Sequence, residues 1–367
     1  MTALQPLVLM MAGGTGGHVY PALAVATELR ERGYRVAWVG TARGLEARVV
    51  PQAGIELHCL AVRGVRGKNP LWKIVAFLSL LLAAVQALWL VYRLAPQCVV
   101  GLGGYVAGPA GIAAWLLRKP LIIHEQNAVA GTTNRMLAPF ASKVLAGFPR
   151  AFSADVEVAT VGNPVRRELL AMAGESSFSY AGDRPLRLLV LGGSLGAKPI
   201  NDLVPGVVRQ LSTGEGAAAM EVRHQCGESH VEQVCESYGG LLQQEVEVSA
   251  FIEDMAGAYG WADLVLCRAG ALTISELAIM GRPSILVPLP HAIDDHQTYN
   301  ARSLSDCGAA FLLSQAQMTA QALEELLRGY IVHPQRLLSM AVAAVAAAKP
   351  EATALVCSAC EELIHGR

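Results

Sequence analysis

The sequence predicts an α/β protein with two Rossmann-like halves, each a parallel sheet covered by helices, that face a common cleft. Apolar runs of strand length alternate with helical segments along the chain. A strand followed by a glycine-rich turn also occurs twice, as LVLMMAGGTGG at residues 7–17 and as RLLVLGGSLGA at residues 187–197. This repeat favours two nucleotide-fold domains with a ligand site between them.

The first glycine turn, Gly13 to Gly17, joins an apolar strand to a helix expected from Pro21 to Arg32. Its glycines allow positive φ and a close approach of backbone N–H groups to a ligand. The N-terminus of the following helix favours an anion or a sugar hydroxyl. His18 follows this turn and is a candidate general base at neutral pH.

Further strands are expected at Tyr34–Gly40, Ile55–Leu60, Cys98–Val100 and Leu121–His124. The strand near Cys98 leads into a second glycine turn, GLGGYVAGP. The strand from Leu121 ends on polar residues that include Glu125 and Asn127. Polar groups at the carboxyl ends of parallel strands project into the ligand crevice, so both residues are candidate site residues.

Charge is distributed unevenly along the chain. Residues 1–163 hold 15 Lys and Arg against 7 Asp and Glu, and the remainder holds 14 against 23. No acidic residue occurs between Glu56 and Glu125, an interval that contains Arg63, Arg66, Lys68, Lys73, Arg93, Arg118 and Lys119. This interval is expected to bind an anionic surface. Leu and Trp separate these charges, which favours a lipid surface over nucleic acid.

The segment Leu71 to Tyr92 has no charge after Lys73 and is long enough to cross a membrane. A span would put strands of one sheet on opposite sides of the bilayer, so we expect none. Two alternatives remain: a crossover helix buried on both sides, or an interfacial helix on an anionic membrane, which the flanking basic residues favour. Residues 1–11 lack the features of a signal peptide, so a cytoplasmic location is expected.

The charge balance changes sign at the loop Val161 to Arg167, where we place the domain boundary. The expected domains are residues 1–163, residues 164–345, and a C-terminal helix in residues 346–367 that packs back toward the first domain. In the second domain a strand ends near Cys267 and a helix is expected from Thr273 to Met280. Thr273 and Glu276 have the spacing of a capping box, but a diphosphate site with a ribose-binding carboxylate is an alternative.

No metal site is predicted from the cysteines or from the polar loop at residues 291–297. Cys357 and Cys360 form a single C-x-x-C without a second pair, and the eight cysteines are expected to be free thiols. His291, Asp294, Asp295 and His296 are expected to cap a helix and contact sugars. The sequence predicts no required cofactor and leaves assistance by Mg²⁺ open.

In this order, GGTGGH, GLGGYVAGP, HEQNAVAG, VGNPVR, GGSLGA, CRAGALTISE and DDHQ are highly specific together. The sequence resembles the MurG family of peptidoglycan N-acetylglucosaminyltransferases, which have the GT-B fold, and the resemblance covers essentially the whole chain. It implies an inverting transfer of N-acetylglucosamine (GlcNAc) from UDP-GlcNAc to the C4 hydroxyl of undecaprenyl-diphosphate-MurNAc-pentapeptide (lipid I), which forms lipid II. It also implies a peripheral enzyme on the cytoplasmic face of the bacterial inner membrane, with other cell-wall enzymes as further partners.

The resemblance assigns most donor contacts to the second domain. The implied donor-binding residues are Thr15, Gly16, Gly17, Asn127, Arg166, Ser194, Ile252, Ala271, Leu272, Thr273, Ile274, Ser275, Glu276 and Gln297, with Asp295 near the sugar. The implied acceptor-binding residues are Gly14, Gly104 and Tyr105. Leu195 departs from the family, which often has Gln at this position, so a side-chain contact there is not expected.

His18 is the first candidate for the catalytic base and Glu125 the second, and the sequence does not separate them. Two other functions compete with the transferase. A UDP-GlcNAc 2-epimerase would have the same architecture but would need no acceptor and no membrane helix. A membrane-bound sensor of nucleotide sugars would tolerate the loss of both His18 and Glu125.

Overall fold

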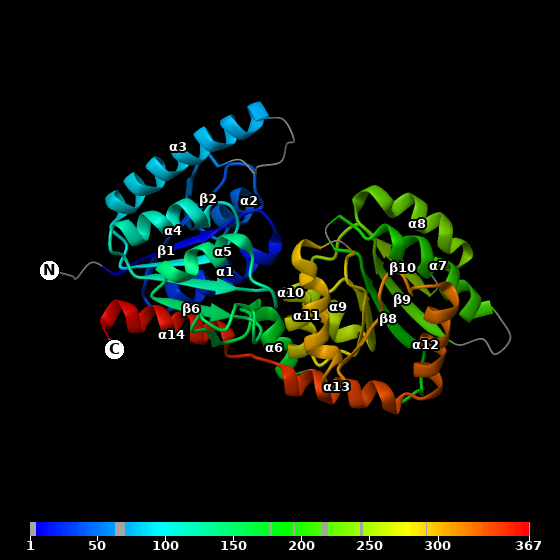
Figure 1. Ribbon diagram of the computed structural model, residues 1–367. Helices are drawn as coiled ribbons and strands as arrows, with labels where there is room; N and C mark the ends of the chain where they lie inside the picture. Colours follow the sequence, from blue (N-terminus) through cyan, green and yellow to red (C-terminus); the bar gives the residue numbers. More distant parts are fainter. Residues whose placement is uncertain are drawn as a thin grey trace. The chain divides into compact units, whose positions relative to one another are not determined.

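The computed structural model describes residues 5–62, 70–175, 178–193, 195–213, 219–242, 245–290 and 292–366. Side chains are not described at residues 70–78, 174, 175, 213 and 293. The chain divides into two compact units (Figure 1), and each is described by itself. Unit 1 comprises Met1–Arg166 and Pro350–Arg367, and unit 2 comprises Arg167–Lys349. The division falls in the loop where the charge balance changes sign.

Unit 1 contains a parallel sheet of seven strands, in the order β3-β2-β1-β4-β5-β6-β7. The strands are β1 (Leu7–Ala12), β2 (Arg35–Gly40), β3 (Glu56–Cys59), β4 (Cys98–Gly103), β5 (Leu121–Glu125), β6 (Lys143–Ala146) and β7 (Ala159–Thr160). Its helices are α1 (Gly16–Glu31), α2 (Glu46–Gln52), α3 (Pro70–Leu94), α4 (Ala107–Leu116), α5 (Thr132–Leu137), η1 (Ala138–Phe140) and α14 (Ala352–His365). The strand order reverses between β1 and β4, the position at which open α/β sheets bind ligands.

Alternate residues of β1 enter two cores on opposite faces of this sheet. Val8 and Met10 pack in the core that α1 and α14 cover, and Leu9 and Met11 pack in the core under α3 and α4. Helices α3 and α4 lie side by side over one face, and α14 packs against α1 (Figure 1). The continuous apolar sequence of β1 therefore results from burial on both faces.

Unit 2 contains a parallel sheet of six strands, in the order β10-β9-β8-β11-β12-β13. The strands are β8 (Leu186–Leu191), β9 (Met220–Gln225), β10 (Val246–Ser249), β11 (Leu264–Cys267), β12 (Ser284–Leu286) and β13 (Ala310–Leu312). Its helices are α6 (Arg167–Glu175), α7 (Lys198–Thr213), η2 (Glu228–His230), α8 (Val231–Tyr238), η3 (Gly239–Leu241), α9 (Met255–Trp261), α10 (Ala271–Ile279), η4 (Ile293–Asp295), α11 (His296–Ser305), α12 (Ala320–Val332) and α13 (Gln335–Ala347). Its strand order reverses between β8 and β11.

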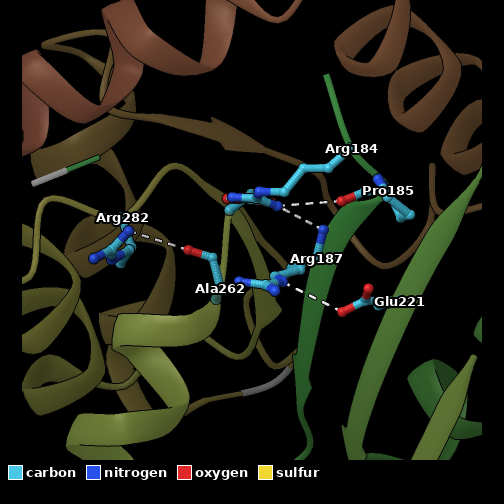
Figure 2. A network of polar contacts seen from close by, with 7 residues as sticks. Arg184, Pro185, Arg187, Glu221, Ala262 and Arg282 are labelled. Atoms are coloured by element: carbon cyan, nitrogen blue, oxygen red, sulfur yellow. Dashed lines mark hydrogen bonds and ion pairs between the residues drawn. The ribbon is translucent and has the colours of Figure 1, made fainter. Parts of the chain in front are cut away.

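A buried carboxylate ties the start of β8 to the start of β11 (Figure 2). Asp263 accepts two hydrogen bonds from the Arg184 guanidinium, at 2.6 and 2.8 Å, and one from the Arg187 N–H at 3.0 Å. The Arg187 side chain reaches Glu221 on the next strand at 3.3 Å, and Arg282 donates to the Ala262 carbonyl at 3.2 Å. These contacts fix the register at the end of the sheet opposite the glycine turn.

Two sequence expectations about helices are corrected. Helix α1 begins at Gly16 rather than Pro21, so His18 lies in its first turn and Pro21 lies inside the helix. In unit 2, α10 begins at Ala271 with Gly270 as its N-cap, so Thr273 is not an N-cap residue and forms no capping box with Glu276. In both places the helix begins directly after the glycine turn, and its N-cap residue, Thr15 or Gly270, has an extended backbone and makes no side-chain cap hydrogen bond.

Helix α3 connects β3 to β4, and both strands belong to one sheet. A membrane span through α3 is therefore excluded, as expected. The segment Gln335–His365 is also long and apolar enough to span a membrane by composition. It is divided at residues 348–351 into α13 and α14, which have 13 and 14 residues and belong to different units. Neither helix alone reaches the length of about 20 residues that a span needs.

Candidate active site

The first glycine turn lies at the carboxyl end of β1, where the strand order reverses. Gly14 has φ of 94° and is exposed, as are Thr15 and Gly17, while His18 is half-buried. The N–H of Gly14 donates to Glu46 Oε2 at 3.0 Å. An acceptor contact at Gly14 would therefore use its exposed backbone surface rather than this N–H.

The second glycine turn follows β4 and packs against the first. Gly103 and Gly104 have φ of 106° and 87°. A Cβ on Gly103 would lie 2.9 Å from the His18 ring, and a Cβ on Gly104 would collide with the carbonyl oxygen of Gly13. Only glycine fits at either position, so the two turns pack closely and form one surface. Tyr105 follows the second turn and is 59% exposed.

A chain of hydrogen bonds connects His18 to the loop after β7. His18 Nδ1 lies 2.8 Å from Gln126 Oε1, and Gln126 Nε2 lies 3.0 Å from His124 Nδ1. His124 Nε2 in turn lies 2.8 Å from the carbonyl oxygen of Gly162. His124 is fully buried, and this burial lowers its pKa, so the ring is neutral at physiological pH.

The donor and acceptor of each hydrogen bond between His18 and Gly162 follow from the Gly162 end. The Gly162 carbonyl only accepts, so His124 carries its proton on Nε2 and accepts at Nδ1. Gln126 must then donate through Nε2, which also donates to the His124 carbonyl at 2.9 Å, and present Oε1 to His18. His18 therefore carries a proton on Nδ1, so in the neutral form of the ring Nε2 holds the lone pair that a general base needs.

The Glu125 carboxylate is buried at the end of β5 and accepts four hydrogen bonds from the following loop and from α5. Oε1 accepts from the Asn127 N–H at 2.9 Å and from Asn127 Nδ2 at 3.2 Å. Oε2 accepts from the Gly131 N–H at 3.0 Å and from Asn134 Nδ2 at 2.8 Å. These bonds hold the loop that carries Asn127, a half-buried side chain at the edge of the sheet.

Arg166, the last residue of unit 1, lies over the ring of Tyr20 in α1, with its guanidinium carbon 5.6 Å from the ring centroid. This cation–π contact brings a positive charge to the helix that begins at the first glycine turn.

In unit 2, the N-terminus of α10 lies at the carboxyl end of β11. Gly270 is the N-cap and has no side chain, so no cap side chain binds the N–H groups of residues 271–273. The first helical hydrogen bond runs from the Ile274 N–H to the Gly270 carbonyl at 3.0 Å. Ser275 donates its hydroxyl to the Ala271 carbonyl at 3.1 Å. This helix end is suited to bind an anion.

The Glu276 carboxylate is held from below by the buried Tyr259, whose hydroxyl donates to Oε2 at 3.1 Å. Ile252 is half-buried in the loop after β10, next to Phe251, which is 57% exposed. These residues surround the end of the sheet at which α10 begins.

Gln297 is the second residue of α11, and its Oε1 accepts from the N–H of Leu289 in the loop after β12 at 2.9 Å, which directs its amide donors away from this loop. Asp294 and Asp295 both adopt the left-handed conformation, with φ of 54° and 51°. Aspartate is among the residues that tolerate it. Ser194 and His291 lie outside the described residues.

Comparison with known proteins identifies the family. Residues 8–146 match the glycosyltransferase family 28 N-terminal domain, and residues 187–356 match the C-terminal domain of the same family. The chain belongs to glycosyltransferase family 28. It is therefore an enzyme that transfers a glycosyl group.

The curated relatives of this family are similar over their full length. The UDP-N-acetylglucosamine--N-acetylmuramyl-(pentapeptide) pyrophosphoryl-undecaprenol N-acetylglucosamine transferase of Pseudomonas entomophila (strain L48) is 52% identical over 361 residues, which cover 98% of both chains. The enzyme of the same name from Pseudomonas syringae pv. syringae (strain B728a) is 53% identical over 359 residues, 98% of this chain and 99% of the relative. The predicted membership of this group of N-acetylglucosamine transferases is confirmed.

Solved structures confirm the predicted GT-B fold. The crystal structure of Acinetobacter baumannii MurG is 40% identical, covers 97% of this chain and 99% of its own, and has a TM-score of 0.80. A putative UDP-N-acetylglucosamine 2-epimerase from Listeria monocytogenes has a TM-score of 0.70 at 13% identity and 99% coverage of this chain. That second likeness concerns the fold alone.

Sequence reasoning missed two residues of the candidate site. Gln126 and His124 fix the proton on His18, although the sequence analysis singled out only Glu125 and Asn127 from this stretch. The available signal was the run of polar residues in HEQN at the end of an apolar strand. Among the described residues, no group of three or more His, Cys, Asp or Glu side chains is arranged to hold a metal.

Proposed function

We propose that this chain transfers GlcNAc from UDP-GlcNAc to the C4 hydroxyl of lipid I, with inversion at the anomeric carbon, and so forms lipid II for peptidoglycan synthesis. The donor and acceptor are those implied by the name of the curated relatives. The observation that carries the chemistry is the hydrogen-bond chain from Gly162 to His18, which fixes a proton on His18 Nδ1 and so directs proton exchange with the substrate to Nε2 of this half-buried imidazole at the glycine surface.

In the proposed mechanism, His18 Nε2 removes the proton from the C4 hydroxyl as the hydroxyl oxygen attacks C1 of GlcNAc. The bond from C1 to the UDP oxygen breaks, and the electron pair leaves with UDP. Glu125 is the weaker candidate for the base, because four hydrogen bonds hold its carboxylate. Gly14, Gly104 and Tyr105 are the proposed acceptor contacts.

The proposed donor site uses the N-terminus of α10 from Ala271 to Glu276 for the diphosphate and ribose. The helix N–H groups and Arg166 would stabilise the charge that develops on UDP, so the proposal requires no metal. Tyr259 holds one oxygen of Glu276, in keeping with a fixed ribose acceptor. Ser194, Ile252, Gln297, Asn127 and residues Thr15 to Gly17 complete the proposed donor contacts.

We propose further that unit 1 binds an anionic membrane through α3, at the cytoplasmic face of the inner membrane where lipid I is held. Two polar side chains of α3 bind the segment that follows β3: Ser79 Oγ donates to the Ala61 carbonyl at 2.7 Å, and Gln86 Oε1 accepts from the Ala61 N–H at 2.9 Å. The outward side chains are apolar and exposed: Leu80, Leu81, Leu82, Val85, Leu88, Trp89 and Tyr92. This exposure excludes the alternative of a helix buried on both sides.

The neighbouring α4, which packs against α3, also exposes apolar side chains, namely Trp115 at 47% and Leu116 at 56%. Basic groups accompany these two helices: Arg93 lies over the Trp89 ring at 4.7 Å, and Arg118 and Lys119 follow α4. Tryptophan and basic side chains at the edge of an apolar surface are suited to an anionic interface. Arg63, Arg66 and Lys68, also predicted here, lie outside the described residues, as do the side chains of Trp72 and Lys73.

The deciding experiment measures UDP release from UDP-GlcNAc with and without a lipid I analogue, for the wild type, His18→Ala and Glu125→Gln. We expect release to depend on the acceptor. His18→Ala should lower kcat by about 10²- to 10⁴-fold, as loss of a general base does. Release that ignores the acceptor would instead support an epimerase, and full activity of His18→Ala would refute the assignment of the base.

A further inference from the structure

Glu46 is a fully buried carboxylate beneath the first glycine turn, and it has no part in the proposed chemistry so far. It is the first residue of α2 and has 0% of its surface exposed. Among the described residues, no lysine or arginine forms an ion pair with it. A buried carboxylate without a cation is costly unless hydrogen bonds compensate for the lost water.

Those hydrogen bonds come from the turn and from the end of β2. Oε2 accepts from the Gly14 N–H at 3.0 Å. Oε1 accepts from the Thr41 N–H at 2.9 Å and from the Thr41 hydroxyl at 2.7 Å, and the same hydroxyl accepts from the Gly44 N–H at 3.1 Å. Both oxygens therefore face backbone donors that cannot turn away.

Three glycines make the space that the carboxylate occupies. A Cβ on Gly13 would lie 2.7 Å from Glu46 Oε1, and a Cβ on Gly40 would lie 2.6 Å from its Cγ. A Cβ on Gly44 would collide with the carboxyl group itself. The three glycines come from the first turn, the end of β2 and the loop before α2, so three segments are built around this one side chain.

The first turn is thus held from two sides. Glu46 contacts it from within the protein, and Gly104 of the second turn packs onto the Gly13 carbonyl. Gly13 to Thr15 leads without a break into α1, whose third residue is His18. A shift of the turn would therefore move the first N–H groups of α1 and the imidazole together.

We propose that Glu46 is a positioning residue for glycosyl transfer, which fixes the first glycine turn through the Gly14 N–H and so sets the position of His18 and the start of α1. The inference rests on the proposed function in one respect, namely that this turn contacts the substrates. The role requires an acceptor at both oxygens and the full reach of a glutamate side chain.

The test compares Glu46→Gln with Thr41→Ala. Glu46→Gln keeps the volume but places an NH₂ group against the N–H of either Gly14 or Thr41, which displaces the turn or the loop. We expect kcat/KM for the lipid I analogue to fall by about 10- to 100-fold, the range that a misplacement of the order of 1 Å produces. Thr41→Ala removes one donor to Oε1 but keeps the Gly14 contact, so it should lower the Tm and leave kcat/KM near that of the wild type.

Binding of UDP, followed by calorimetry, reports whether the rest of the protein is intact. We expect both variants to bind UDP with unchanged stoichiometry, because the proposed UDP site lies mainly in unit 2. Gly44→Ala gives a second approach if Glu46→Gln does not fold, since the added methyl group pushes the carboxyl group while its charge is kept. Gly44→Ala should also lower kcat/KM for the lipid I analogue.

Wild-type kcat/KM in Glu46→Gln, or equal losses of kcat/KM in Glu46→Gln and Thr41→Ala at equal losses of Tm, would overturn the positioning role. These outcomes differ from a failure of the proposed function. If His18→Ala remained fully active while Glu46→Gln lost activity, the base assignment would fall and the role of Glu46 in holding the turn would stand.

Discussion

His18 is the residue on which the proposed chemistry depends, and its competence as a base is set by residues more than 100 positions away in the sequence. The Gly162 carbonyl, His124 and Gln126 leave only one arrangement of protons that satisfies all their contacts. A neutral histidine without such partners exchanges between two tautomers, and only one of these leaves the lone pair on Nε2.

Replacing Gln126 with leucine should therefore lower kcat without removing any group that touches substrate. The leucine leaves His18 Nδ1–H and His124 Nδ1 without partners, so the imidazole loses its fixed tautomer and orientation. We expect a fall in kcat of about 10- to 100-fold, smaller than the loss for His18→Ala. Single-turnover UDP release measures this rate. A rate equal to that of the wild type would show that the hydrogen bonds through Gln126 do not control His18.

Glu125→Gln should act through stability more than through chemistry. The amide nitrogen would face two of the four N–H groups that now donate to the carboxylate, so the Asn127 loop should loosen. We expect a loss of about 1–3 kcal/mol in the free energy of unfolding, the usual cost of leaving buried donors unpaired. Urea unfolding tests this, and a large kcat loss at unchanged stability would instead return Glu125 to the role of base.

At this scale the sequence singled out individual residues of the candidate site but not the contacts between them. His18, Glu125 and Asn127 could be predicted because polar residues at strand ends and glycine turns are local patterns. The bond between His18 and Gln126 joins residues 108 positions apart, and the Glu46 contact to Gly14 joins residues 32 apart. Neither pairing has a signature in local sequence, because both depend on which strands become neighbours.

Among the elements, α3 is the one whose sequence and structure agree most closely. Ser79, Gln86 and Arg93 recur every seven residues, which predicts a narrow polar stripe. The structure shows that Ser79 and Gln86 bind the backbone of Ala61, whereas Arg93 is exposed and lies over the Trp89 ring. The stripe therefore anchors the helix and leaves its apolar side outward. Sequence periodicity identified the stripe but did not reveal which side faced the protein.

Changing two outward residues of α3 should separate membrane binding from catalysis. The double substitution Val85→Glu and Trp89→Glu puts two negative charges on side chains that are 64% and 58% exposed. We expect binding to vesicles with 30% anionic lipid to fall by about 10-fold or more, since each change removes apolar contact and adds repulsion. Turnover of a water-soluble acceptor analogue should stay unchanged.

The matched control for this pair is Leu338→Glu with Val342→Glu on α13, two exposed apolar residues of unit 2. Vesicle binding should survive this change. Equal losses in both double variants would mean that net charge, and not the surface of α3, controls binding.

The network of Figure 2 predicts a stability effect at the element level. Asp263→Asn leaves an amide nitrogen against the Arg184 guanidinium or the Arg187 N–H at the joint between β8 and β11. Because the Asp263 side chain is 4% exposed, we expect the free energy of unfolding to fall by about 2–4 kcal/mol. This is less than for a fully buried ion pair, because Arg184 is partly exposed. Glu221→Gln, at a side chain 41% exposed, should cost less than about 1 kcal/mol by the same urea titration.

At the scale of the molecule, the sequence predicted two parallel-sheet halves because strand and helix signals alternate. Edge strands such as β7, β10 and β13 were not predicted, since they are two to four residues long and carry little periodicity. The C-terminal α14 belongs to the first unit, where Arg32 pairs with Glu361 at 2.9 Å and Lys143 pairs with Glu362. Covering the sheet of unit 1 therefore requires both ends of the chain.

Among the described residues, each unit buries one histidine whose pKa is lowered by burial, and this predicts how stability depends on pH. In unit 2, His224 lies between Tyr238 Oη at 2.9 Å and Asn201 Oδ1 at 3.1 Å, and burial lowers its pKa from 6.5 to about 4. In unit 1, burial also lowers the pKa of His124. Between pH 6.5 and 4 the unfolded chain takes up a proton at residue 224 that the folded chain does not, so stability falls as the pH falls through this window.

The lowered pKa of His224 should reduce the free energy of unfolding by about 3 kcal/mol once the pH is below both pKa values, and by about 2 kcal/mol at pH 5. Hydrogen exchange at pH 7 and pH 5 measures it, because protection of β8 and β9 reports on unit 2 and protection of β5 reports on unit 1 separately. His224→Gln should reduce the pH dependence in unit 2 and leave that of unit 1 unchanged. If protection in unit 2 were the same at both pH values in the wild type, His224 would have to accept a proton within the folded core, and the assignment of a neutral buried ring would be wrong.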